Sequence, residues 1–333
     1  MLKKLKFWLD NSRWVALPQS LMPAVTAVAM AAARPGFLPL CSFLAVLGVC
    51  AAHLSFNLFD DYFDYKKNKP GVRETLARAG FRARIGKCGY LVSGEATVGQ
   101  LLLAALVFGG IAALCGVVIF IFRGASVIWF AFITALLGIS YSGGPLRLGY
   151  RGVGELILGL IFGPMLVSGV YFSACGGLHP GVVIVGAAIG SLVANILYTH
   201  SALDLEADRS VGKLTLAGII PTNKGRLIIT MILTFAPFGV ILAGILSGLL
   251  SPSYLLLALT IPLAIALAKS MREFHRGDTM PLLRRTWYGP MTRWKEIREA
   301  GIDWFMLRWY IARNLLAAFS CIVIAATVLE WAL

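Results

Sequence analysis

The sequence contains little charge and few acidic residues. Only 14% of its 333 residues are charged, and just 16 of them are Asp or Glu, whereas soluble domains carry roughly 25% charged residues. Hydrophobic residues make up 58% of the chain. This composition excludes an ordinary soluble domain, because a hydrated surface needs more polar side chains. It indicates a protein that is folded largely within lipid.

Two kinds of functional motif are also missing. The six cysteines show none of the spacings that are typical of metal ligands, and we interpret them as small apolar residues. No glycine-rich nucleotide-binding loop occurs where a strand would lead into a helix. The sequence therefore argues against a thiolate metal site and against a nucleotide-binding α/β enzyme.

Long apolar runs recur along the whole chain, and each is about as long as a helix that crosses the hydrocarbon core. Backbone groups in lipid must bond to one another, which favours helices. We therefore predict an all-α, polytopic membrane protein with a single membrane-embedded domain over residues 1–333. The nine predicted transmembrane helices cover residues 17–34, 36–58, 97–121, 125–142, 153–174, 181–203, 227–248, 253–270 and 311–331.

The two sides of these spans differ in charge. If the N-terminus lies inside, every Lys and Arg except Arg34 and Arg123 falls on the inner side. The positive-inside rule then predicts a multi-pass protein of the inner (plasma) membrane, with a cytoplasmic N-terminus and an external C-terminus. Topology and anionic membrane lipids account for the net charge of +14, so we expect no nucleic-acid partner.

Two segments outside the spans carry basic residues. Residues 1–16 include Lys3, Lys4 and Lys6 and lack a small-residue cleavage site, which predicts an interfacial segment and not a removable signal. Residues 269–313 are predicted as a long cytoplasmic loop before the last helix. The second half of this loop is rich in basic residues and Trp, which is typical of a helix that lies on the membrane surface.

The acidic residues gather in two short clusters at the inner ends of predicted spans. One lies in NLFDDYFDYKK (residues 57–67) and the other in SALDLEADRSVGKLTLA (residues 201–217). Unpaired carboxylates at membrane depth are costly, so this placement favours a functional role. The acidic side chains are Asp60, Asp61 and Asp64 in the first cluster and Asp204, Glu206 and Asp208 in the second.

Helical spacing places members of each cluster on one face. Asn57 and the three aspartates after it follow an i, i+3, i+4, i+7 pattern, and Asp204 and Asp208 are four residues apart. Hard oxygen donors suit Mg²⁺, which typically takes one or two carboxylates plus substrate phosphates. We predict a site for two or more substrate-bridged Mg²⁺ ions that hold a diphosphate. The predicted metal ligands are Asn57, Asp60, Asp61, Asp64, Asp204 and Asp208.

Basic residues of the inner loops are suited to a diphosphate, because they stabilise the charge that builds on a leaving group. For any single one of them, an ordinary role in setting the topology explains the charge equally well. The predicted diphosphate-binding residues are Lys67, Arg84, Arg147, Arg209 and Lys213.

The two acidic motifs resemble those of the UbiA superfamily of intramembrane prenyltransferases. The resemblance covers about residues 15–270 and, weakly, the last helix. Within the superfamily, the chain is most similar to the 1,4-dihydroxy-2-naphthoate polyprenyltransferases of menaquinone synthesis. This closer similarity rests on the form of the first motif, on LVSGEATVGQLL (residues 91–102) and on YSGGPLRLGYRGVGELILGLIFGPM (residues 141–165).

The resemblance implies nine helices around a central cavity, with the acidic motifs facing each other across its mouth. It also implies a reaction in which a polyprenyl group passes from an allylic prenyl diphosphate to an aromatic acid. With 1,4-dihydroxy-2-naphthoate, the acceptor loses CO₂ and gives demethylmenaquinol. The expected catalytic residues are Asp60, Asp64, Asp204, Asp208 and Tyr141.

Two histidines precede the clusters by one helical turn, His53 before Asn57 and His200 before Asp204. They either orient a metal ligand or bind the acceptor, or they are hydrogen-bonded polar residues inside the bundle. Gly159 and Gly163 are expected to serve close packing of helices.

Other functions remain open at this point. A different ring acceptor, such as 4-hydroxybenzoate, is compatible with the same motifs. DDYFD also fits the Asp-Asp-x-x-Asp motif of soluble prenyl-chain synthases, although nine spans argue against that fold. A cation transporter is an alternative of a different class, but its acidic residues are expected near the middle of the bilayer.

Overall fold

The computed structural model describes residues 2–67, 88–210, 212–277 and 283–332. These residues form helices and loops without a β-strand, and one isolated bridge pairs Arg151 with Leu214. The predicted all-α membrane fold is therefore confirmed. In chain order the helices are α1 (Leu2–Asn11), η1 (Trp14–Ala16), α2 (Pro18–Ala32), α3 (Pro39–Lys67), α5 (Gly89–Val92), α6 (Val98–Arg123), α7 (Ser126–Ser142), η2 (Leu148–Tyr150), α8 (Gly154–Leu160), η3 (Ile161–Met165), α9 (Leu166–Cys175), α10 (Pro180–Leu203), α11 (Leu205–Ser210), α12 (Leu216–Ile219), α13 (Asn223–Leu246), η4 (Pro252–Thr260), α14 (Ile261–His275), η5 (Thr286–Tyr288), α15 (Trp294–Glu299) and α16 (Asp303–Ala332).

Helical structure lies at every predicted span, but the spans differ in length. Within the described ranges, seven helices are long and apolar enough to cross a membrane, by length and composition. The other two predicted spans, 17–34 and 125–142, correspond to α2 with 15 residues and α7 with 17 residues. α2 begins at Pro18, and Pro35 and Gly36 follow soon after its end, which explains why it is short.

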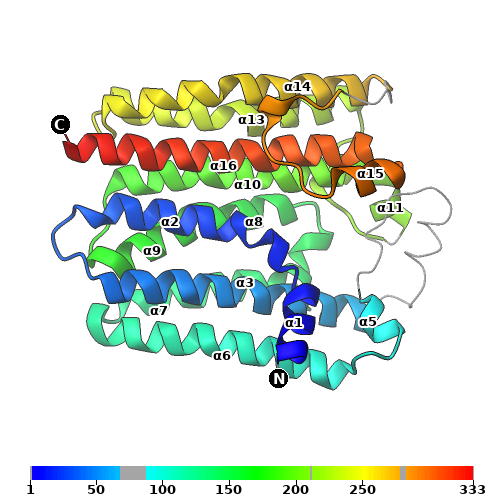
Figure 1. Ribbon diagram of the computed structural model, residues 1–333, viewed down its shortest axis with the longest axis horizontal. Helices are drawn as coiled ribbons and strands as arrows, with labels where there is room; N and C mark the ends of the chain where they lie inside the picture. The colour runs from blue at the N-terminus through cyan, green and yellow to red at the C-terminus, as the bar shows by residue number, and fades with distance from the viewer. Residues whose placement is uncertain (1, 68–87, 211, 278–282, 333) are drawn as a thin grey trace.

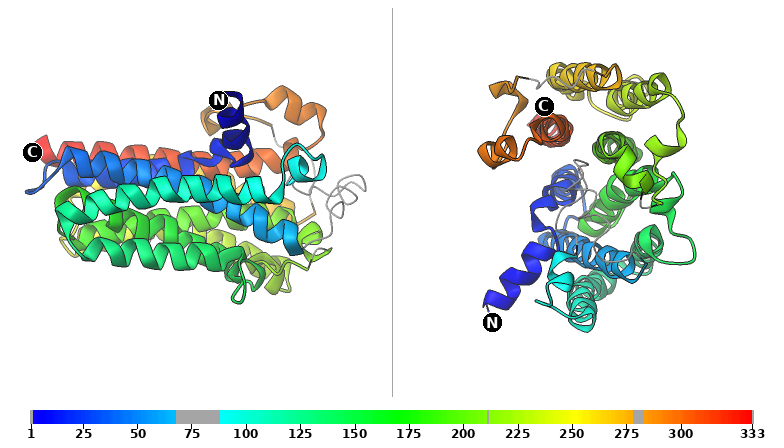
Figure 2. Two further views of the ribbon diagram at one scale, coloured as in Figure 1. Left: turned by 90° about the horizontal axis from the view of Figure 1, so that it is seen from below. Right: turned by 90° about the vertical axis from the view of Figure 1, so that its right-hand side faces the viewer.

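The long helices lie side by side, and α1 runs across them (Figures 1 and 2). α3 packs along α6, α10 packs along α13, and α16 contacts α2, α10 and η4. The C-terminus lies at one end of the bundle, whereas α5, α11 and α15 lie at the other, and α1 crosses the bundle nearer to that other end (Figure 1). The C-terminal ends of α3 and α10 are therefore brought to the same end of the bundle, together with both acidic motifs.

Polar caps fix where two of the long helices begin. The Thr97 hydroxyl accepts a hydrogen bond from the backbone N–H of Gln100, and the Gln100 side chain accepts one from the Thr97 N–H, which forms a capping box at α6. The Thr222 hydroxyl accepts from the Gly225 N–H at the start of α13. These bonds satisfy N–H groups that have no partner within the helix.

Glycines allow α8 and η3 to touch α10. A Cβ atom added to Gly163 would lie 2.4 Å from the Gly186 carbonyl oxygen and 2.4 Å from the Gly190 Cα, and one added to Gly159 would lie 2.7 Å from the Gly190 carbonyl oxygen. The prediction that Gly159 and Gly163 serve close helix packing is confirmed. η3 is a π-helical turn that contains Pro164, which has no N–H to donate to a regular α-helical ladder.

The segment 269–313, predicted as one long loop, is helical at both ends, so those loop bounds are wrong. α14 continues to His275, and α16 begins at Asp303. The second half of the segment also does not form one surface helix, because Gly301, with φ of 65°, separates the short α15 from α16. Phe305 is fully buried. Because this part of the chain packs against the bundle, α16 begins earlier in the sequence than predicted.

Candidate active site

A cavity of about 390 Å³ opens between α2, α3, α7, η3, α10 and α16, near the end of the bundle that carries α11. Most of its wall is apolar, and the rings of Phe56, Phe63 and Phe162 contribute to it. A few polar side chains converge on the same space. An apolar cavity with a small number of placed polar groups is the usual form of a site for a small ligand.

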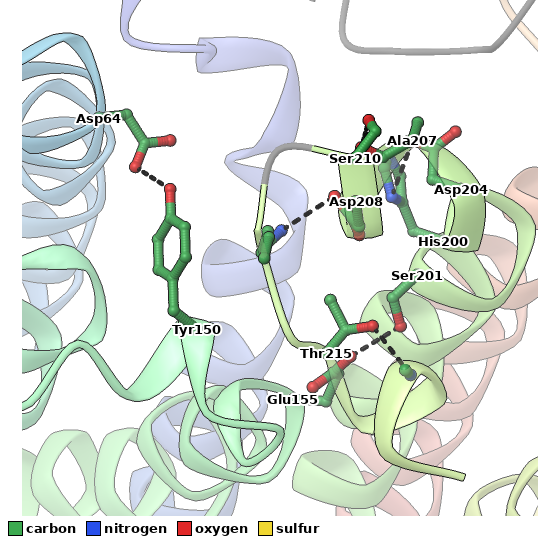
Figure 3. Close-up of polar contacts among 12 residues, drawn as sticks. Asp64, Tyr150, Glu155, His200, Ser201, Asp204, Ala207, Asp208, Ser210 and Thr215 are labelled. Atoms are coloured by element: carbon green, nitrogen blue, oxygen red, sulfur yellow. Dashed lines mark hydrogen bonds and ion pairs between the residues drawn. The ribbon is translucent and has the colours of Figure 1, made fainter. Parts of the chain in front are cut away.

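The first acidic cluster divides between the cavity and the protein interior. Asn57, Asp60 and Asp64 line the cavity, as their helical spacing predicts. The Ser142 hydroxyl donates a hydrogen bond to Asp60. The Tyr150 hydroxyl donates to Asp64 at 2.5 Å (Figure 3). α7 and the loop after it therefore hold the two carboxylates at the cavity wall.

Asp61 is placed differently from its neighbours. It is only 2% exposed and is not among the residues that line the cavity. The Arg13 guanidinium forms an ion pair with Asp61 and a second one, at 3.3 Å, with Asp60. The Tyr90 hydroxyl also donates to Asp61, at 3.2 Å. In this structure the Asp61 carboxylate therefore pairs with Arg13 and Tyr90.

Arg13 links the N-terminal segment to this cluster. Burial lowers the pKa of Arg13, but the charges of Asp61 and Asp60 outweigh burial and raise that pKa above its usual value. The Asn57 amide donates to the Ser12 carbonyl oxygen at 3.0 Å, which adds a second contact to the same segment. Sequence reasoning missed Arg13, because one basic residue before the first span looks like any other topology charge.

The second acidic cluster lies where α10 ends and α11 begins. The Asp208 N–H donates to the Asp204 carbonyl oxygen at 2.9 Å, so helical spacing continues across the junction and both side chains are buried. The His200 Nδ1 atom lies 3.6 Å from a carboxylate oxygen of Asp204, and the Lys213 Nζ atom lies 3.7 Å from one of Asp208. His200 and Lys213 line the cavity, whereas the two aspartates lie behind them.

The two clusters occupy opposite sides of the same region, with Asp64 on α3 and Asp208 on α11 (Figure 3). Glu155 fixes the loop that carries Lys213. Its carboxylate accepts hydrogen bonds from the Ser201 hydroxyl at 2.7 Å and from the Leu216 N–H at 3.1 Å. Glu155 thereby ties α8 to α10 and to the start of α12.

The carboxylate oxygens of the two acidic clusters suit Mg²⁺, although they lie in two separate groups. Among the described residues, no three or more His, Cys, Asp or Glu side chains are gathered so that they could hold a metal ion. The carboxylates of Asp60 and Asp64 face the cavity, and Asp208 keeps one buried oxygen that accepts no hydrogen bond from the described part of the chain. Mg²⁺ takes few protein carboxylates and completes its shell with water and substrate phosphates. The residues present fit such an ion.

The predicted diphosphate-binding residues differ in placement. Lys213 lines the cavity. The Arg147 guanidinium lies 4.9 Å from the centre of the Tyr150 ring, beside the residue that holds Asp64. Arg209 is exposed, donates to the Gly218 carbonyl oxygen at 3.3 Å and is not part of the cavity wall. The Lys67 side chain and Arg84 lie outside the described residues.

Tyr141 is part of the cavity wall. Its ring packs closely on two glycines. A Cβ atom added to Gly149 would lie 2.9 Å from the Tyr141 ring, and one added to Gly154 would lie 3.1 Å from it. These glycines therefore allow the loop after α7 and the start of α8 to pack against the ring.

Comparison with known proteins gives consistent results. A sequence model described as the UbiA prenyltransferase family matches residues 20–289. A 1,4-dihydroxy-2-naphthoate octaprenyltransferase of Bacillus subtilis is 28% identical over 238 residues, which cover 68% of this chain and 70% of the relative. A protein of Mycobacterium tuberculosis with the same name is 26% identical and covers 84% of this chain and 91% of the relative.

Solved structures share the fold. A UbiA homolog from Aeropyrum pernix superposes with a TM-score of 0.62 at 16% identity, covering 95% of this chain and 98% of that chain. A UbiA homolog from Archaeoglobus fulgidus, solved bound to DMAPP and Mg²⁺, gives a TM-score of 0.59 at 16% identity and covers 96% and 99% of the two chains.

Proposed function

The chain belongs to the UbiA prenyltransferase family and is a multi-pass, membrane-bound prenyltransferase, and we propose that it transfers a polyprenyl group from an allylic prenyl diphosphate to 1,4-dihydroxy-2-naphthoate. The observation that carries this proposal is the mostly apolar cavity that is lined by Asp60 and Asp64 and by Lys213, which pairs with Asp208. Such a site suits a substrate with a highly charged head and a long apolar tail.

The polar part of the site would bind the diphosphate. Lys213 lines the cavity, and Arg147 lies beside Tyr150. Their positive charges stabilise the diphosphate as the C–O bond breaks and the electron pair leaves with its oxygen. Two or more Mg²⁺ ions, when bound by Asp60, Asp64, Asp204 and Asp208, supply further charge neutralisation at the diphosphate oxygens. Asn57 lines the same wall and would complete the ligand set.

The apolar part of the cavity would protect the allylic cation. Phe56, Phe63 and Phe162 line it, and an apolar wall keeps water from reacting with a carbocation. A ring carbon of the acceptor forms the new bond to the terminal carbon of the prenyl group. The bond between that ring carbon and its carboxylate then breaks, its electron pair restores the aromatic ring, and CO₂ leaves.

The identity of the acceptor rests on the relatives. Those from Bacillus subtilis and Mycobacterium tuberculosis are both named 1,4-dihydroxy-2-naphthoate octaprenyltransferase, and their coverage of this chain supports the same substrate class here. The charge distribution supports a plasma-membrane location with a cytoplasmic N-terminus. The position of the C-terminus, at the end of the bundle away from α11, is compatible with an external C-terminus.

Purified protein tests the proposal directly. It is incubated in detergent with Mg²⁺, a prenyl diphosphate and a panel of aromatic acids that includes 1,4-dihydroxy-2-naphthoate and 4-hydroxybenzoate, and the products are identified by mass. We expect prenylated dihydroxynaphthoate that has lost the mass of CO₂. Prenylation of 4-hydroxybenzoate alone would contradict the acceptor, and no prenylated product with any acid would contradict the reaction.

A further inference from the structure

His53 is a buried polar residue in the cavity wall that the reaction described above does not use. It lies on α3, is 7% exposed and lines the cavity. Around it the wall is largely apolar, and its ring meets the Phe162 ring at a centroid distance of 5.6 Å. An imidazole in such surroundings needs hydrogen bonds to offset the loss of water.

Only one nitrogen of His53 has a hydrogen-bond partner among the described residues. The Nδ1 atom is hydrogen-bonded to the Ser20 hydroxyl on α2. The Nε2 atom is buried and has no hydrogen-bond partner in the described part of the chain. A histidine that serves packing alone is expected to satisfy both nitrogens. The Nε2 atom is therefore suited to a group that arrives with a ligand.

The place of His53 along α3 indicates which ligand this is. Asp64, Asp60, Asn57 and His53 succeed one another from the end of α3 towards the middle of the bundle. At 1.5 Å per residue, His53 lies about 10 Å along the helix axis from Asp60. A diphosphate held near Asp60 would place the reacting carbon of the prenyl group between these two residues, with the acceptor ring on the His53 side.

We propose that His53 binds the aromatic acceptor, through a hydrogen bond from a ring hydroxyl of the acceptor to Nε2. This inference rests on the proposed function. The hydroxyl is the one next to the ring carbon that is prenylated. A hydrogen bond that this hydroxyl donates increases electron density on the ring, which favours attack on the allylic cation. Ser20 is a positioning residue, because its contact with Nδ1 fixes the orientation of the imidazole.

Two substitutions at His53 separate this role from simple packing. The amide nitrogen of Asn can occupy the place of Nδ1 and keep the contact with Ser20, whereas the longer side chain of Gln can place a polar atom near the position of Nε2. His53→Asn should raise KM for the acceptor about 10- to 100-fold, because a site that is built around a hydroxyl loses its partner. His53→Gln should stay within a few fold of the parent, and KM for prenyl diphosphate should change little in either variant.

An acceptor analogue in which that hydroxyl is methylated completes a double-mutant cycle. The parent should use the analogue poorly, and His53→Asn should use the analogue no worse than the parent does. Equal acceptor kinetics for His53→Asn and the parent, or losses for analogue and variant that simply multiply, would overturn the inference. An equal rise in KM for both substrates in both variants, with a lower melting temperature, would assign His53 to packing and would also overturn it. If the parent enzyme prenylates no aromatic acid, it is the proposed function that fails.

Discussion

The Arg13 guanidinium bridges Asp60 and Asp61, and so joins the segment before the first long helix to the acidic motif at the end of α3. The Asp61 side chain is almost fully buried, while that of Arg13 keeps 27% of its surface exposed. The ion pair balances negative charge that would otherwise be unfavourable at this depth. It also makes the N-terminal segment part of the site.

The first prediction concerns the stability that this ion pair provides. Arg13→Gln should lower the free energy of unfolding by about 3 kcal/mol, because removing one partner leaves a buried carboxylate without its counter-charge. The measurement is the thermal unfolding of purified protein in detergent. Lys6→Gln is the matched control, because it removes one positive charge from an exposed position of the same segment. Equal melting temperatures for the two variants would show that the ion pair contributes no stability.

The second prediction concerns the divided acidic site. Asp64→Ala and Asp208→Ala should each reduce turnover by about 100- to 1,000-fold or more, because each removes a carboxylate from the proposed metal and diphosphate site. EDTA should abolish activity, and added Mg²⁺ should restore it.

Glu206→Ala provides the control for these variants, because Glu206 is exposed on α11, two residues from Asp208. It should keep the activity of the parent. Normal membrane insertion and a normal gel-filtration profile would show that the inactive variants are folded. Substantial turnover by either aspartate variant, or in EDTA, would contradict the two-cluster mechanism.

The third prediction concerns orientation in the membrane. In a background without native cysteines, a cysteine at Gly177 should react with a membrane-impermeant thiol reagent added to intact cells, and one at Glu95 should not. Both positions are exposed and lie in loops at the ends of helices. The asymmetry of Lys and Arg motivates this expectation. The reverse labelling pattern would invert the proposed topology.

The fourth prediction concerns the glycine contact beside the cavity. Gly163→Ala should destabilise the protein by about 1–3 kcal/mol, because its Cβ would lie 2.4 Å from the backbone of α10. Thermal unfolding in detergent measures the effect. Gly116→Ala is the control, since a Cβ there meets no atom within 4 Å, and alanine favours the helix at such a position. An unchanged melting temperature for Gly163→Ala would mean that the helices can separate at no cost.

The fold and the acidic clusters could be predicted from the sequence because both depend on local patterns. Apolar runs of membrane-spanning length give the helices, and the spacing of Asp60 and Asp64 gives one cavity-facing surface on α3. The true start of α16 depends on the packing of side chains such as Phe305, which is fully buried. No local pattern of the sequence records that packing.

The orientation of Asp61 could not be predicted for a related reason. Its spacing from Asn57 is as suitable for a metal ligand as that of Asp60, but Arg13 and Tyr90 approach it from distant parts of the chain. The role of Glu155 likewise depends on contacts with Ser201 and the Leu216 backbone. Spacing along one helix identifies which side chains share a face, while long-range contacts decide which of them reach the cavity.

The wall of the cavity also constrains the order in which a working protein can be made. It includes Arg13, near the start of the chain, and Trp309, near its end. A ribosome that has inserted α3 and α10 has placed both acidic motifs in the membrane while the last part of the wall is still untranslated. The cavity therefore cannot close until α16 has been synthesised, and a chain truncated before α16 would expose the apolar side of this cavity to lipid and water.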